Sequence, residues 1–222
     1  MPEQLSQAEE NYLKAIYKVS KRDGTPVGNN AISTEMQTSA ASVTDMINRL
    51  SQKELVHYQK HKGVSLSDDG MRTAVHLVRK HRLWETFLVE KLSFNWDQVH
   101  ELAEQLEHIQ SRELINRLDS FLEFPKYDPH GEPIPDEQGR MAERQQIPLS
   151  ELAVAQQAVV VGVKDHTTPF LQYLERTGLL LGVELNINER LEYDNSLQIE
   201  FMNGEKILVS QKVGQNLFVQ MK

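Results

Sequence analysis

His100, Glu104 and His108 recur at every fourth position of the stretch HELAEQLEH (100–108), and Glu107 falls three positions after Glu104. On a helix, residues three and four apart lie on one face, so these four side chains would form a single polar stripe. Imidazole nitrogens and carboxylate oxygens gathered in this way can bind a divalent cation. The alternative is the solvated face of an amphipathic helix, which the intervening apolar residues would also produce.

The composition limits the classes of protein to which the chain can belong. It has 222 residues, no cysteine and a formal net charge of −8. Without cysteine, disulfides, thiolate catalysis and cysteine-ligated metal centres are excluded. The chain contains no apolar run of membrane-spanning length, and its acidic start is not typical of a secretory signal, so we expect a cytoplasmic protein without membrane contact. Residues 1–80 carry 11 Lys and Arg against 9 Asp and Glu, so nucleic-acid binding would fall to this part and cation binding to the acidic remainder.

The first third of the chain has the pattern of a winged helix. Ser6 and Glu9 form a capping box that predicts a helix to about Ser20. A short helix around 30–36 and a second one after Ser39 predict a helix-turn-helix. Alternating apolar residues on both sides of the turn at 61–63 then predict a β-hairpin over 56–67.

This order of elements indicates DNA binding, with the second helix in the major groove. Its outward-facing residues are small and polar and suit base contacts: Ser39, Ser42, Thr44 and Asn48. At the hairpin tip, Lys60 and Lys62 suit contacts with phosphates. The alternative is an ordinary surface helix with a solvated loop.

Three amphipathic helices are predicted next, over 67–91, 96–110 and 111–122. Their apolar surface exceeds what a small winged helix needs, which predicts a homodimer that reads palindromic double-stranded DNA. Residues 124–148 include five prolines and form a linker. The pattern then changes to strands, with one helix over 169–178 that Gly178 would end and a hairpin around Asn203-Gly204, and favours an SH3-like β-barrel. The predicted fold class is α+β, mainly α, with domains at 1–72, 73–147 and 148–222.

The whole chain resembles the diphtheria toxin repressor and manganese transport regulator family of metal-dependent transcriptional repressors. Five segments carry the resemblance: AEENYLKAIY (8–17), SAASVTDMINRL (39–50), VRKHRLWETFL (78–88), VHELAEQLEH (99–108) and YDPHGEPIP (127–135). The resemblance implies a repressor of metal-homeostasis genes. It also implies that the third domain is SH3-like and of FeoA type, and that metal binding sets the DNA-competent dimer.

The resemblance also implies which residues bind metal. His81, Glu85 and His100 match one site of the family, and Glu104, Glu107 and His108 match a second together with Asn11. In a variant of the family that uses the linker and the third domain, Asp128, His130 and either Asp165 or His166 would join Glu85. Two positions depart from the family pattern, because Asn11 replaces the usual Met or Asp and Lys14 replaces a glutamate. Lys14 argues against a closely coupled pair of metals and favours the linker variant.

Oxygen and imidazole ligands without thiolate suit Mn²⁺ or Fe²⁺. Glu104 favours Mn²⁺, because iron-sensing members of the family often have cysteine there. One alternative is a winged-helix regulator controlled by a non-metal ligand. Another is a di-metal carboxylate enzyme, but the paired Glu-x-x-His motifs of such bundles do not occur here. We therefore expect a regulator and not an enzyme.

Overall fold

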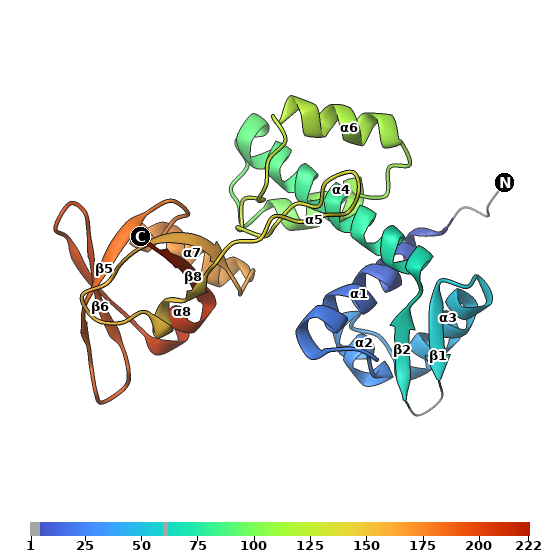
Figure 1. Ribbon diagram of the computed structural model, residues 1–222, viewed down its shortest axis with the longest axis horizontal. Coiled ribbons are helices and arrows are strands. Elements are labelled where there is room, and N and C mark those ends of the chain that lie inside the picture. Colours follow the sequence, from blue (N-terminus) through green and yellow to red (C-terminus); the bar gives the residue numbers. More distant parts are fainter. Residues whose placement is uncertain (1–4, 60–61) are drawn as a thin grey trace. The chain divides into compact units, whose positions relative to one another are not determined.

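The computed structural model describes residues 5–59 and 62–222 of the chain. Helices and one hairpin make up the described chain as far as residue 121, and strands dominate after residue 147 (Figure 1). This confirms the predicted class, which is mainly α with an N-terminal winged helix and a C-terminal β domain.

The winged helix consists of α1 (Gln7–Asp23), α2 (Asn29–Glu35), α3 (Ala40–Gln52), β1 (Val56–Gln59) and β2 (Gly63–Leu66). Both hydrogen bonds of the capping box between Ser6 and Glu9 are present, and the Ser39 side chain accepts a bond from the Ser42 amide to cap α3. Its core is a set of fully buried apolar side chains: Leu13, Ile16, Ile32, Val43, Ile47, Leu50 and Val64.

Helices α4 (Asp68–Leu92), α5 (Val99–Leu106) and α6 (Arg112–Phe121) follow. Helix α5 is shorter than the predicted span of 96–110. At its start, residues 96–98 form a turn in which Gln98 N donates to Asn95 O. At its end, Ile109 N donates to Leu106 O, an i→i−3 bond that tightens and ends the last turn. Only His100 and Glu104 of the predicted stripe therefore lie on the helix.

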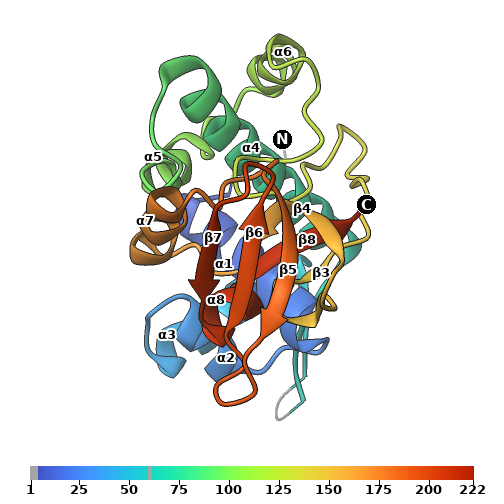
Figure 2. The same cartoon turned by 90° about the vertical axis from the view of Figure 1, so that its left-hand side faces the viewer.

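The C-terminal domain is an antiparallel sheet with the strand order β3-β8-β4-β5-β6-β7 (Figure 2). Its strands are β3 (Ile147–Pro148), β4 (Gln157–Val163), β5 (Glu184–Arg190), β6 (Leu197–Phe201), β7 (Lys206–Val209) and β8 (Leu217–Met221). The 3₁₀ turn η1 (Leu149–Glu151) and helices α7 (Thr168–Thr177) and α8 (Gln211–Asn216) complete it. Helix α7 ends at Gly178, as predicted, whereas the short α8 has no apolar period long enough to predict it.

The contacts between Cα atoms divide the chain into two compact units. The first contains Met1–His81, Glu104–Arg117 and Pro135–Arg140, and the second contains Arg82–Ala103, Leu118–Ile134 and Met141–Lys222. The first unit therefore includes the winged helix, and the second includes the sheet. Each unit has its own cluster of acids and histidines.

Candidate metal centre and nucleic-acid interface

Three buried side chains of the second unit come together: Glu85 of α4 with Asp128 and His130 of the segment between α6 and β3. One potential ligand atom of each lies within 4.8 Å of the others, and the three residues are 3%, 5% and 2% exposed. We call these three residues the loop site. Burying two carboxylates beside each other is costly unless a positive charge lies with them.

The turn that contains Asp128 leaves one of its oxygens for a ligand. Oδ1 of Asp128 accepts hydrogen bonds from the backbone N–H of His130 at 2.9 Å and of Glu132 at 3.0 Å. Oδ2 is buried and has no hydrogen-bond partner among the described residues, although Arg82 Nε lies 3.5 Å away. A buried acceptor without a partner destabilises the protein by about 1–3 kcal/mol, and a cation bound here would remove that cost. The residues present therefore fit a metal ion.

A backbone carbonyl sets the orientation and the tautomer of His130. The Trp96 carbonyl oxygen lies 2.8 Å from Nε2 of His130 and can only accept, so Nε2 carries a proton. The other ring nitrogen, Nδ1, faces Glu85 Oε2 at 3.6 Å. The imidazole also stacks against the rings of Trp96 and His166, whose centroids lie 6.0 and 4.9 Å away. In the neutral ring, Nδ1 is the atom that can bind a metal, and Trp96 holds it in place.

The other predicted ligands of the second unit differ in how they are placed. His100 Nδ1 lies 3.3 Å from Glu85 Oε1, so His100 joins the loop site through that carboxylate. His166 joins it through its stack on His130. Oδ1 of Asp165 instead accepts a hydrogen bond from Thr167 N at 2.9 Å. Of the two alternatives at the end of β4, the histidine is therefore the one in contact with the loop site.

The turn is held against β4 at two successive residues, His130 and Gly131. Val163 N donates to His130 O at 2.9 Å, and the Arg144 guanidinium donates to Gly131 O at 2.7 Å and to Val161 O at 2.6 Å. Gly131 has φ +85°, and an added Cβ would lie 2.1 Å from Val161 O. Only glycine fits this conformation and this close approach of two backbones.

Protons compete with a metal ion for the loop site. Burial raises the pKa of Asp128, and the neighbouring charges of Glu85 and Glu132 raise it further. Burial would lower the pKa of His130, but its interactions with Glu85 and Asp128 outweigh this effect and raise it to about 9. Without metal, His130 is therefore a cation at neutral pH and supplies the positive charge that the two carboxylates need.

We expect metal binding at the loop site to release this proton and to become tighter as the pH rises. A ligand imidazole must be unprotonated, so below pH 9 the metal has to displace the proton on Nδ1 of His130. By linkage, the affinity for Mn²⁺ should rise about tenfold per pH unit between about pH 7.5 and 8.5, and more steeply below pH 7, where Asp128, whose pKa is raised to about 7, must also lose a proton. Calorimetric titrations in two buffers of different ionisation enthalpy would measure the proton release. An affinity that does not change over this range would contradict the assignment of His130.

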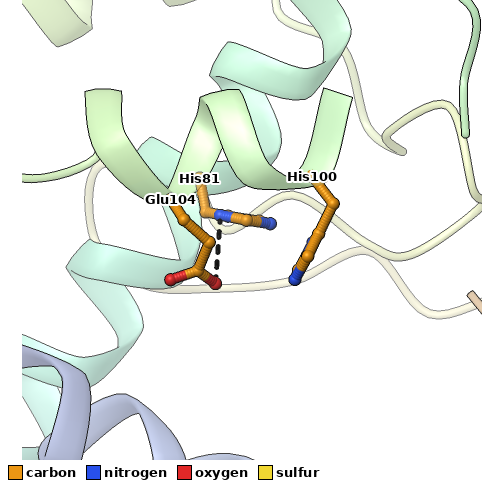
Figure 3. A group of neighbouring side chains, drawn as sticks. All are labelled: His81, His100 and Glu104. Carbon is orange, nitrogen blue, oxygen red and sulfur yellow. Dashed lines mark ion pairs between the residues drawn. The ribbon is translucent and has the colours of Figure 1, made fainter. Parts of the chain in front are cut away.

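The acids and histidines of the first unit surround a lysine. Lys14 of α1 is 4% exposed, and its Nζ lies 2.6 Å from Glu104 Oε1 and 2.7 and 2.6 Å from the two oxygens of Glu107. His81 Nδ1 lies 2.6 Å from Glu107 Oε2 and 3.9 Å from Glu104 Oε1. Figure 3 shows His81 and Glu104 joined by a dashed line, with His100 one turn before Glu104 on α5. We call Lys14, His81, Glu104 and Glu107 the lysine cluster.

The remaining predicted ligands of this unit have other partners. His108 Nδ1 lies 2.6 Å from Glu10 Oε2, and Gln110 donates to Glu10 Oε1 at 2.7 Å. The Asn11 Oδ1 atom is buried without a hydrogen-bond partner among the described residues. Sequence reasoning did not identify Glu10 as a partner, although its place next to Asn11 could have suggested it.

The predicted DNA contacts lie on α3 and the hairpin. Ser39, Ser42 and Asn48 are exposed. Thr44 is partly buried, because its hydroxyl donates to Ala40 O at 2.9 Å and accepts from Asn29 Nδ2 at 3.1 Å. Thr44 thus helps to hold α3 against α2 and is less available to DNA. Lys62 is exposed at the base of the hairpin turn, and Lys60 lies outside the described residues.

Comparisons with known proteins cover nearly the whole chain. Residues 4–64 match the model of the iron dependent repressor N-terminal DNA binding domain. Residues 67–136 match the iron dependent repressor metal binding and dimerisation domain, and residues 147–221 match the FeoA domain. No helix among the described residues is long and apolar enough to cross a membrane.

Individual relatives agree with these matches. The iron-dependent repressor IdeR of Mycobacterium leprae is 31% identical over 126 residues, which cover 57% of this chain and 54% of the relative. A probable metal transport system membrane protein of Chlamydia trachomatis is 46% identical over 86 residues, 39% of this chain and 19% of that protein. The matched segments thus span about half or less of these two curated relatives.

Solved structures match over the full length. A manganese-dependent transcriptional repressor in complex with manganese is 30% identical, with a TM-score of 0.84, and the match covers 96% of this chain and 100% of that one. The manganese regulator SloR is 34% identical, with a TM-score of 0.73 and coverages of 96% and 98%.

Proposed function

Because this chain belongs to the family of iron- and manganese-dependent repressors, we propose that it is a metal-dependent transcriptional repressor that binds double-stranded DNA as a homodimer. Its targets would be metal-homeostasis genes with palindromic operators, and it would act in the cytoplasm, where that DNA lies. The observation that carries the proposal is the loop site, a buried set of one imidazole nitrogen and two carboxylates in a chain that also has a winged helix. The role proposed is regulatory and not catalytic.

We propose that the loop site holds the activating metal, with His100 and His166 beside it. Carboxylate oxygens and an imidazole without any thiolate suit Mn²⁺ or Fe²⁺, and we favour Mn²⁺ because the two solved structures described above are manganese regulators. When bound, the metal would supply the positive charge that two buried carboxylates require. It would act by favouring one conformation, and a shift from 1:99 to 99:1 requires about 5.5 kcal/mol of preference for that conformation.

The switch between the metal-free and the metal-bound state would depend on the charge of His130 in the loop site. Without metal, the proton on Nδ1 of His130 partly balances Glu85 and Asp128. Glu85, Asp128 and Nδ1 of His130 would hold the metal, which requires the imidazole to be neutral, and the Trp96 carbonyl keeps the remaining proton on Nε2. The turn that contains these residues is fixed to β4 by Arg144, so a change at the loop site reaches the sheet directly.

The proposal is tested by recovering an operator and measuring its affinity. Selection from random double-stranded DNA in the presence of Mn²⁺ should yield a palindrome, since a two-fold dimer reads two half-sites. Fluorescence anisotropy on this DNA should give an affinity at least about 100-fold higher with Mn²⁺ than with chelator, as expected for a coupling of about 3 kcal/mol. Equal affinities in the two conditions would reject metal activation and favour control by another ligand.

A single added charge on α3 should weaken DNA binding without affecting the metal. Asn48 is exposed on the face of α3 that we assign to the major groove, so N48D places a carboxylate against DNA. We expect about a tenfold loss of operator affinity or more in the Mn²⁺-loaded protein, with unchanged Mn²⁺ affinity. The matched control is N203D, because Asn203 is exposed in the turn between β6 and β7 and an aspartate can still accept the Glu205 N–H. Equal effects of the two variants would remove Asn48 from the interface.

A further inference from the structure

The lysine cluster does not fit the second metal that the family resemblance implies at these positions. We propose that the Lys14 ammonium is the resident cation of this cluster, so that the chain binds a single divalent ion, at the loop site. This inference rests on the proposed function only for the metal at the loop site. The role of Lys14 does not depend on DNA binding, so it can be tested by measuring Mn²⁺ binding alone.

The contacts of Lys14 use its full bonding capacity. An ammonium group has three N–H donors, and Nζ lies within 2.7 Å of three carboxylate oxygens, one of Glu104 and both of Glu107. Such short charge-assisted bonds are the strongest class of hydrogen bond in proteins. A divalent ion that took both oxygens of Glu107 as ligands would have to break two of them.

His81 also occupies an oxygen of Glu107 that a metal would need. The carboxylate of Glu107 can only accept, so Nδ1 of His81, at 2.6 Å, is the donor and carries its proton toward the acid. A nitrogen that donates to the carboxylate cannot bind a metal at the same time, so only Nε2 of His81 could bind one. For both oxygens of Glu107 to become metal ligands, Lys14 and the Nδ1 proton of His81 would have to leave them.

The charges of the lysine cluster also argue against a divalent ion there. Glu107 is fully buried and Lys14 is 4% exposed, so the pair is shielded from water. Burial would raise the pKa of Glu104, but the charge of Lys14 and its hydrogen bond to Glu104 lower the pKa of this acid. Asn11, at the position where relatives can supply a carboxylate, contributes an amide and no charge. A divalent ion added to the cluster would lie beside a buried ammonium and be repelled by it.

The contacts of Lys14 also have a consequence for the switch. Lys14 belongs to α1 of the winged helix, and Glu104 and Glu107 lie at the end of α5 and just after it. The ammonium therefore ties α1 to these acids whether or not metal is bound. Metal control is thereby left to the loop site.

Stoichiometry tests the inference. After saturation with Mn²⁺ and gel filtration, elemental analysis should find about one Mn²⁺ per chain in the wild type and in K21M, and about two in K14M. K21M is the matched control, because Lys21 is on the same helix but exposed. In K14M, the carboxylates of Glu104 and Glu107 lose their cation and should accept a divalent ion instead. Two Mn²⁺ in the wild type, or a count in K14M equal to that of K21M, would overturn the proposal.

A thermal shift provides a second readout and guards against a variant that does not fold. We expect K14Q and K14M to melt below the wild type without metal and to gain more from Mn²⁺ than the wild type does, since the metal replaces the missing cation. Two results would contradict the proposal that Mn²⁺ can take the place of the Lys14 ammonium. One is that neither variant folds even with Mn²⁺, and the other is that Mn²⁺ raises their melting temperatures no more than that of the wild type. If the wild type bound no Mn²⁺ while K14M bound one, the proposed function would be contradicted, but the role of Lys14 as the cation of the lysine cluster would be confirmed.

Discussion

Replacing Glu85 by glutamine is expected to abolish metal-dependent DNA binding. Glu85 is 3% exposed, and its two oxygens lie 3.3 Å from His100 Nδ1 and 3.6 Å from His130 Nδ1. E85Q keeps the shape of the side chain but removes the buried negative charge that a cation requires. We expect Mn²⁺ affinity to fall by about 100-fold or more, exceeding the usual effect of losing a supporting residue. Operator affinity in Mn²⁺ should then equal that in chelator.

The control for this variant lies on the same helix. E90Q removes a carboxylate from α4 whose side chain is 49% exposed, so both metal and DNA affinities should stay within about twofold of the wild type. Circular dichroism would confirm that E85Q is folded. If E85Q kept the response of DNA binding to Mn²⁺, Glu85 could not be a ligand of the activating metal.

Replacing Gly131 by alanine is expected to destabilise the protein and to disrupt the loop site. The added Cβ would lie 2.1 Å from Val161 O and 2.5 Å from Gly162 Cα, and both atoms belong to the backbone of β4. Because neither can move without disturbing the sheet, we expect a loss of about 3 kcal/mol of stability, the upper range for overpacking. The neighbouring His130 would move with the turn, so Mn²⁺ affinity should also fall by about tenfold.

The matched control isolates the clash from the backbone conformation. Gly204 has the same φ of +85° as Gly131, but an added Cβ would meet nothing within 4 Å. G204A should therefore cost only about 1 kcal/mol, the strain of a left-handed alanine, and leave Mn²⁺ affinity unchanged. Denaturant unfolding of the two variants gives the comparison. Equal losses would show that the turn is not pressed against β4.

Local patterns were sufficient to predict most of the elements. The capping box at Ser6, the cap at Ser39 and the terminating Gly178 all act over a few residues, and each lies where the sequence predicts it. The boundaries of α5 were wrong, because its continuous apolar pattern did not reveal the tightened turn at Leu106. Helix α8 is too short to show a period, and its cap at Ser210 was the only local signal.

Part of the grouping of the candidate site could be predicted from the sequence. His100 lies beside Glu85, as the sequence predicts, but the hydrogen bond between His81 and the carboxylate of Glu107 was not predicted. Lys14 could be recognised as a departure from the family, but its bonds to Glu104 and Glu107 join residues 90 and 93 positions apart. Likewise, only the fold shows that the Trp96 carbonyl sets the tautomer of His130. Such contacts depend on tertiary packing, which local patterns do not encode.

The most direct test of the loop site as the metal centre is a crystal structure of the Mn²⁺-saturated protein with anomalous scattering data collected above the manganese edge. We expect one strong anomalous peak per chain, in contact with Glu85, Asp128 and Nδ1 of His130. Lys14 should remain bonded to Glu104 and Glu107. A peak within the lysine cluster and none at the loop site would show that the loop site does not hold the metal.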